Sequence, residues 1–207
     1  MSKLALGVLA SHGGTNLQAI IDSCLSGAID AEVRVVISNN SRSLALERAR
    51  RADIPTAHLS GSTHPDPDSL DEAIADTLQR HGVEVVALAG YMKMLGPRTL
   101  GTYRNRILNV HPALLPKFGG QGMYGERVHQ AVLASGDSVS GVTVHLVDEE
   151  YDRGPVVAQT EVPVLPGDTP DTLAARVLEQ EHILYPETIQ RISTGEIDLN
   201  ALAKTKV

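Results

Sequence analysis

Large aromatic side chains are almost missing from this chain, which has no tryptophan and one phenylalanine among 207 residues. A buried core must therefore be built from Leu, Val, Ile and Ala. The single cysteine, Cys24, cannot form an internal disulfide, which is typical of a reducing compartment. No apolar run reaches membrane-spanning length, and the short N-terminal run lacks the features of a signal peptide. We therefore expect a cytoplasmic protein with no membrane contact.

Basic residues are fewer than acidic ones, 18 against 25, so the formal net charge is -7. This balance argues against broad binding to nucleic acids or anionic membranes. It does not exclude a small anionic ligand, since backbone amides can bind a phosphate locally. No spacing of Cys and His suggests a metal site, so we expect none.

Apolar runs alternate with helix-period patterns along most of the chain. This alternation predicts an α/β fold, with a doubly wound, mostly parallel sheet and helices on both faces. The alternation of strands and helices ends toward the C-terminus, where two expected strands joined by an acidic loop predict an antiparallel pair. The expected strands cover residues 4–10, 33–37, 56–59, 83–89, 107–110, 142–147 and 156–162. The expected helices include the face of Leu17, Ile20, Ile21, Cys24 and Leu25, residues 43–51, the face of Leu70, Ile74 and Leu78, and residues 170–192.

This pattern predicts one domain over residues 1–195. The remaining residues, 196–207, form a polar-rich tail that we expect to be loosely held.

The segment from Asn109 to Pro116 reads NVHPALLP and begins at the end of one of the expected strands. Asn109 and His111 are two residues apart, so on an extended backbone both point to the same face. Pro112 then ends the strand. An amide beside an imidazole can polarise a carbonyl and move protons, although local hydrogen bonding at a strand end is the open alternative.

The first strand leads into Ser11-His12-Gly13-Gly14-Thr15-Asn16, and a helix starts at once. Such a turn lets backbone amides and the helix dipole approach a phosphate. The third glycine of a dinucleotide motif and the Gly-Lys-Ser/Thr of a Walker A loop are both missing. A single phosphate is therefore the better expectation, beside a purely structural turn.

Two further loops are candidate parts of the same site. Residues 117–125 contain four glycines, which favours a mobile flap over a site rather than a stiff element. Residues 148–155 carry several carboxylates, one of which could pair with His111, orient its ring and raise its pKa. Among the remaining histidines, His145 is expected to be a buried supporting residue near the site. Four others are expected to be unremarkable: His58, His64, His81 and His129.

Several segments together resemble the phosphoribosylglycinamide formyltransferases, the folate-dependent glycinamide ribonucleotide transformylases. The segments are residues 13–20, 89–95, 109–116, 152–155 and 181–186. The likeness extends to about residue 195. It implies a formyltransferase fold, with a phosphate-binding half over about 1–100 and a catalytic and folate-binding half over about 101–195. It also implies transfer of a formyl group from 10-formyltetrahydrofolate to the amine of glycinamide ribonucleotide, a step of purine (IMP) biosynthesis.

The resemblance also implies roles for residues at matching positions. The implied catalytic residues are Asn109, His111 and Asp152. Those implied for substrate are Gly14, Thr15 and Asn16 at the phosphate and Glu181 at the ribose hydroxyls. Those implied for folate are Met92, Lys93, Met94, Leu95 and Asn109. The implied partners are small molecules only, with the chain a monomer or homodimer.

This sequence departs from the family pattern in three places. The loop at 117–125 is longer than in the best-known members. The region 63–69 lacks the family's arginine for the folate tail, and Lys93 stands where arginine is common. Two alternative functions remain: another formyl-folate enzyme such as formyltetrahydrofolate hydrolase, or a non-catalytic nucleotide-binding regulator.

Overall fold

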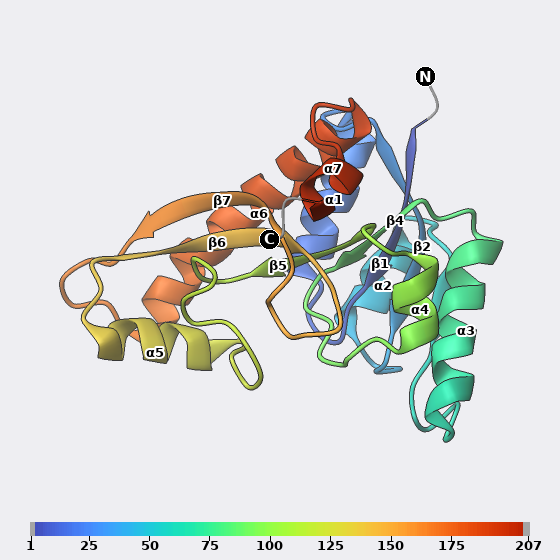
Figure 1. Ribbon diagram of the computed structural model, residues 1–207, viewed down its shortest axis with the longest axis horizontal. Coiled ribbons are helices and arrows are strands. Elements are labelled where there is room, and N and C mark those ends of the chain that lie inside the picture. Colours follow the sequence, from blue (N-terminus) through green and yellow to red (C-terminus); the bar gives the residue numbers. More distant parts are fainter. Residues whose placement is uncertain (1–2, 205–207) are drawn as a thin grey trace.

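A seven-stranded sheet forms the centre of the computed structural model, which describes residues 3–204 (Figure 1). The strand order is β3-β2-β1-β4-β5-β6-β7. The first five strands of this order are parallel, whereas β6 and β7 run antiparallel to their neighbours. The strands are β1 (Leu4–Leu9), β2 (Ala31–Ser38), β3 (Thr56–His58), β4 (Val85–Leu88), β5 (Ile107–His111), β6 (Val139–Leu146) and β7 (Val156–Pro163). The predicted fold class and the antiparallel C-terminal pair are confirmed.

Helices cover both faces of this sheet. They are α1 (Thr15–Ser26), α2 (Leu44–Arg51), α3 (Pro67–Arg80), α4 (Pro97–Thr102), α5 (Glu126–Ser135), α6 (Pro170–Ser193) and α7 (Leu199–Lys204). One apolar core joins the sheet to α1, α2 and α6, and a second joins the opposite face to α3. Figure 1 shows α1 and α6 side by side, where they pack against each other. As expected from the scarcity of aromatics, both cores consist mainly of aliphatic side chains.

The longest helix, α6, is anchored where two parallel strands end. It begins at a capping box formed by Thr169 and Thr172, which satisfies its first free amides. Farther along, the fully buried Tyr185 donates its hydroxyl hydrogen toward the carbonyls of Leu88 and Leu108, at 3.3 and 3.1 Å. This anchor fixes the turn before Tyr185, which carries Glu181, at the carboxyl end of the sheet.

Three parts of the chain differ from the sequence-based expectation. Helices α4 and α5 were not anticipated, because they are only 6 and 10 residues long and α5 directly follows the glycine-rich loop. Leu25 was expected on the buried face of α1 but is 75% exposed, in the last turn before the left-handed cap at Gly27. The tail was expected to be loosely held, but residues 199–204 form α7 and Leu199 is buried. Residues 1–2 and 205–207 lie outside the described part.

None of the helices between residues 3 and 204 is long and apolar enough to cross a membrane.

Candidate functional site

A cavity of about 990 Å³ opens at the carboxyl ends of β1, β4 and β5. This is where ligands bind in doubly wound sheets. Several residues singled out from the sequence line it together: Asn16, Met92, Lys93, Asn109, His111, Asp152 and Glu181. Gly14 and Thr15 are not among its lining residues. Met94 and Leu95 line a second cavity, of about 80 Å³, which shares Asn109 and Asp152 with the first.

The side chains of Asn109 and His145 meet across neighbouring strands. The two residues are directly paired in the ladder between β5 and β6. His145 is 2% exposed, and its Nδ1 lies 2.9 Å from the carbonyl oxygen of Leu146, so this nitrogen carries the proton. Its Nε2 then accepts a hydrogen bond from Nδ2 of Asn109 at 3.0 Å. His145 is thus a buried supporting residue, as expected, and it orients the amide of Asn109.

Asp152 lies between two imidazoles. Its backbone has a left-handed φ of 55°, which directs the loop back toward the strands. Oδ2 is 3.6 Å from Nδ1 of His111 and accepts the Gly120 N–H at 2.9 Å. Oδ1 is 3.5 Å from Nε2 of His145. The contact with His111 is longer than a strong hydrogen bond, so charge attraction to the protonated ring is the main coupling there.

His111 titrates below its ordinary range rather than above it. Burial is the larger influence and lowers the pKa of His111, while the Asp152 charge and the bond to the Phe118 carbonyl act to raise it. The expectation that a carboxylate would raise this pKa therefore identified the correct partner but missed the dominant effect. Burial alone raises the pKa of Asp152, but His145, His111 and the Gly120 amide outweigh it and leave that pKa below its usual value.

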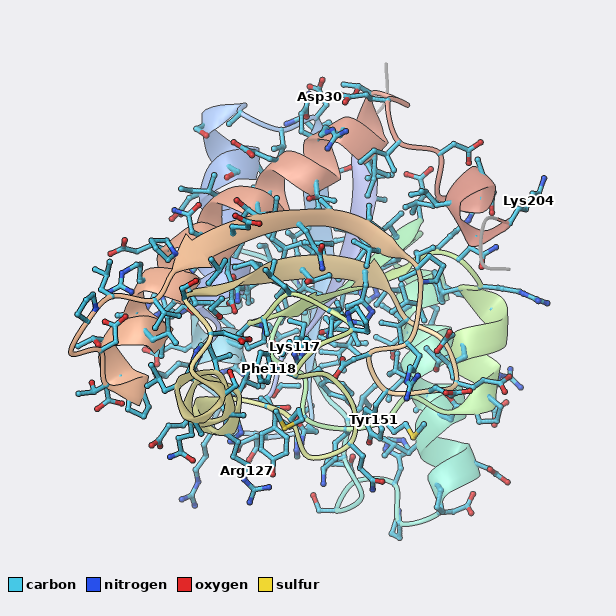
Figure 2. The ribbon with its side chains drawn as sticks, turned by 60° about the vertical axis from the view of Figure 1, so that its left-hand side comes forward. Asp30, Lys117, Phe118, Arg127, Tyr151 and Lys204 are labelled. Atoms are coloured by element: carbon cyan, nitrogen blue, oxygen red, sulfur yellow. The ribbon has the colours of Figure 1, made fainter. Side chains whose placement is uncertain are left out.

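The loop of residues 117–125 contacts this cluster through its backbone. The Phe118 carbonyl accepts a hydrogen bond from Nε2 of His111 at 2.9 Å, and Phe118 has a left-handed φ of 58°. Near the tip, Tyr124 is 51% exposed, and its ring lies 5.3 Å from the guanidinium of Arg127. In Figure 2, Phe118, Arg127 and Tyr151 lie on one side of the molecule, below β6 and β7. The loop thus makes backbone hydrogen bonds to both His111 and Asp152, while Lys117 at its start pairs with Asp137.

The turn before α1 is held by α2. Gly14 has a φ of 68°, and a Cβ there would lie 2.8 Å from both the Cα and the Cβ of Ala45. The Ala45 N–H donates to the His12 carbonyl at 3.1 Å, and Nε of Arg48 donates to the Gly13 carbonyl at 2.9 Å. Helix α1 starts after Gly14 without a side-chain cap. Sequence reasoning missed Arg48, because nothing local to it signals a contact with the turn.

Asn16 and Glu181 form a buried pair beside this turn. Nδ2 of Asn16 donates to Oε2 of Glu181 at 2.6 Å, while Oδ1 of Asn16 has no hydrogen-bond partner. Burial raises the pKa of Glu181 to about 7, and the bond from Asn16 opposes this effect. Asn16 therefore contacts Glu181, a residue 165 positions away in the chain.

His129 was expected to be unremarkable, and that expectation is wrong. It lies on α5, is 4% exposed and lines the large cavity. Its Nδ1 has no hydrogen-bond partner. Burial, followed by the nearby charge of His111, lowers the pKa of His129. Recognising α5 would have revealed this position, because Val128 and Val132 flank it on the buried face.

The other histidines expected to be unremarkable, His58, His64 and His81, are half-buried and line neither cavity. Among residues 3–204, no group of three or more His, Cys, Asp or Glu side chains is arranged to hold a metal ion.

Known proteins are similar to this chain in both fold and sequence. Residues 4–189 match the family model described as formyl transferase. The chain is 42% identical over 93% of its length to the chloroplastic phosphoribosylglycinamide formyltransferase of Arabidopsis thaliana, and it spans only 66% of that relative. It is also 42% identical, over 96% of its length, to the phosphoribosylglycinamide formyltransferase of Haemophilus influenzae, and spans 91% of it. The crystal structure of glycinamide ribonucleotide transformylase 1 from Symbiobacterium toebii has a TM-score of 0.88 at 44% identity, over 94% of this chain and 89% of that one.

Proposed function

The chain belongs to the formyl transferase family, and we propose that it transfers a formyl group from 10-formyltetrahydrofolate to the amine of glycinamide ribonucleotide, a step of de novo purine biosynthesis. The observation that carries the proposal is the convergence of Asn109, His111 and Asp152 on one cavity, in a chain over 40% identical to enzymes with this name. The co-substrate class, a formyl folate, follows from the same relatives.

The chemistry requires a site for a developing negative charge. When the amine attacks the formyl carbon, the carbonyl oxygen gains charge and needs hydrogen-bond donors. Asn109 and His111 lie on one face of β5 and both line the cavity. The Asn109 amide has two hydrogens, one of which bonds His145, so the second remains for the formyl oxygen. Protonated His111 would be the other donor.

Asp152 would stabilise the charged form of His111 against the effect of burial. Burial disfavours the imidazolium, and the carboxylate 3.6 Å from Nδ1 opposes that effect. The Phe118 carbonyl bonds Nε2, the other ring nitrogen. For Nε2 to donate to the formyl oxygen, the loop must withdraw this carbonyl, so we propose that loop movement accompanies substrate binding.

The opposite wall would hold the ribonucleotide. The uncapped amides at Gly14, Thr15 and Asn16 suit the phosphate, because a helix start attracts anions. Glu181 would accept hydrogen bonds from the ribose hydroxyls. The small cavity beside Met94 and Leu95 would receive the folate head group, with Met92 and Lys93 at its entrance.

The test is to mix the protein with glycinamide ribonucleotide and 10-formyltetrahydrofolate, and to follow both the deformylated folate and the formylated acceptor. We expect the two products in equal amounts, and little reaction when the acceptor lacks its phosphate. Folate loss at the same rate without acceptor would instead indicate a hydrolase. Ligand binding without any turnover would indicate a regulator.

A further inference from the structure

His129 combines three properties that the proposed mechanism leaves unused. Its ring is 4% exposed, it lines the large cavity, and its Nδ1 has no hydrogen-bond partner. Leaving a buried polar atom unpaired destabilises the folded state, so native structures rarely do so without a reason. Because the side chain of His129 lines the cavity, a bound substrate can supply the missing partner.

The neighbouring polar groups are already engaged with one another. His111 bonds the Phe118 carbonyl through Nε2 and faces Asp152 through Nδ1. His145 uses both nitrogens, on the Leu146 carbonyl and on the amide of Asn109. Asp152 accepts from the Gly120 amide. Of the cavity-lining imidazoles in this cluster, His129 is the one with an uncommitted buried nitrogen in the described chain.

The reaction needs an acceptor for a proton at this place. An alkylammonium has no lone pair, so the glycinamide amine must lose a proton before it attacks the formyl carbon. Asn109 cannot titrate, and a protonated His111 that donates to the formyl oxygen cannot accept a proton as well. His129 lies on the α5 wall of the same cavity, close enough to His111 to sense its charge.

We propose, on the premise of the formyl transfer above, that His129 is the general base that takes a proton from the substrate ammonium. The N–H bond breaks, its electron pair stays on the amine nitrogen, and the proton moves to Nδ1 and then to water. The amine attacks the formyl carbon, and a second amine proton goes to N10 of the folate as the carbon–N10 bond breaks. One proton is released for each formyl group transferred.

The electrostatic surroundings suit this role. The charged groups and imidazoles that line the cavity with His129 are His12, Lys93, His111, Asp152, Glu126, Arg127, Asp171 and Glu181, and three tyrosines, Tyr91, Tyr124 and Tyr151, line it as well. Burial lowers the pKa of His129, and the charge of His111 acts in the same direction. The ring of His129 is therefore neutral at pH 7, and its lone pair is available to accept a proton.

Replacing His129 with asparagine tests the proposal, because the Asn amide lies near the position of Nδ1 but cannot titrate. We expect the kcat of His129→Asn to fall at least ~100-fold at pH 7, with the KM for glycinamide ribonucleotide nearly unchanged. The deficit should shrink toward pH 9, where the amine deprotonates in solution. The control is His81→Asn, which removes a histidine at the end of α3 outside both cavities and should keep wild-type rates.

A folded His129→Asn with normal turnover, or with the same deficit at every pH, would overturn the proposal. If this variant does not fold, histidine NMR on the wild-type protein decides. Glycinamide ribonucleotide alone should shift the ring signals and the titration of His129, and unchanged signals would exclude the contact. Failure of the wild-type protein to transfer formyl would instead refute the proposed function itself.

Discussion

The two walls of the large cavity are built in opposite ways. The turn of residues 11–16 is held by the fold itself: Ala45 packs against Gly14, and Arg48 bonds the Gly13 carbonyl. The backbone of the loop of residues 117–125 bonds two catalytic candidates, His111 and Asp152, and only Lys117 at its start pairs with a residue outside the cluster, Asp137. Its tip exposes Tyr124.

This difference separates binding from chemistry. A turn shaped by a neighbouring helix is ready for a phosphate before any ligand arrives, so little ordering is needed on binding. The loop is hydrogen-bonded to side chains that titrate, so its conformation changes when those side chains exchange one hydrogen-bond partner for another. The account therefore assigns recognition to the prebuilt wall and control of the reaction to the loop wall.

The largest expected effect is on turnover at the loop wall. His111→Ala removes the charged donor for the formyl oxygen, and we expect kcat to fall at least ~100-fold in a steady-state formyl transfer assay. Binding of glycinamide ribonucleotide should change far less. His81→Ala, at the end of α3, is the control. Near-normal turnover of His111→Ala would remove this residue from the mechanism.

The next effect is on the prebuilt wall. Gly14→Ala forces a side chain into a left-handed conformation and against Ala45, which we expect to lower the free energy of unfolding by about 3 kcal/mol. Gly27→Ala, at the other end of α1, has a similar φ of 75° with no atom within 4 Å. It should cost only about 1 kcal/mol. Urea denaturation of both variants checks the comparison, and equal losses would mean that α2 does not hold the turn.

Much of this contrast could not be read from the sequence. The spacing of Asn109 and His111 and the glycines of the turn predicted both walls, because strand period and turn chemistry are local properties. The contacts of Arg48 with Gly13 and of Asn16 with Glu181 join positions far apart in the chain. His129 was missed because its helix, α5, is too short to be recognised from the spacing of its apolar residues. The lowered pKa of His111 depends on burial, which is defined only by the packing of the folded chain.

A third effect concerns pH and the prebuilt wall. Burial raises the pKa of Glu181 to about 7. The contribution of this residue to the free energy of unfolding is therefore most favourable below about pH 4.5 and is lost as the pH rises through 7. Glu181→Gln removes this dependence. Between pH 5 and pH 8 we expect the variant to gain about 2 kcal/mol relative to wild type. Denaturant titrations at the two pH values measure the gain, and parallel curves would show that burial does not raise the pKa of Glu181.

The smallest effect concerns the loop tip. Replacing Met123 and Tyr124 together by glycine should reduce turnover several-fold, because the loop loses the side chains that close over the substrates. The melting temperature should stay almost unchanged, since Tyr124 is 51% exposed. The paired variant Met123→Leu with Tyr124→Phe keeps the size of both side chains and should retain activity. A large drop in melting temperature would instead indicate that the tip is a fixed part of the fold.

Hydrogen exchange tests the difference between the two walls most directly. Amides of residues 117–125 and 11–18 are compared in the free protein and with glycinamide ribonucleotide plus tetrahydrofolate, a pair that cannot react. The account predicts fast exchange at 117–125 that slows strongly with both ligands, and slow exchange of the hydrogen-bonded amides of Ser11 and Gln18 in both states. Identical slow exchange at 117–125 with and without ligands would contradict it.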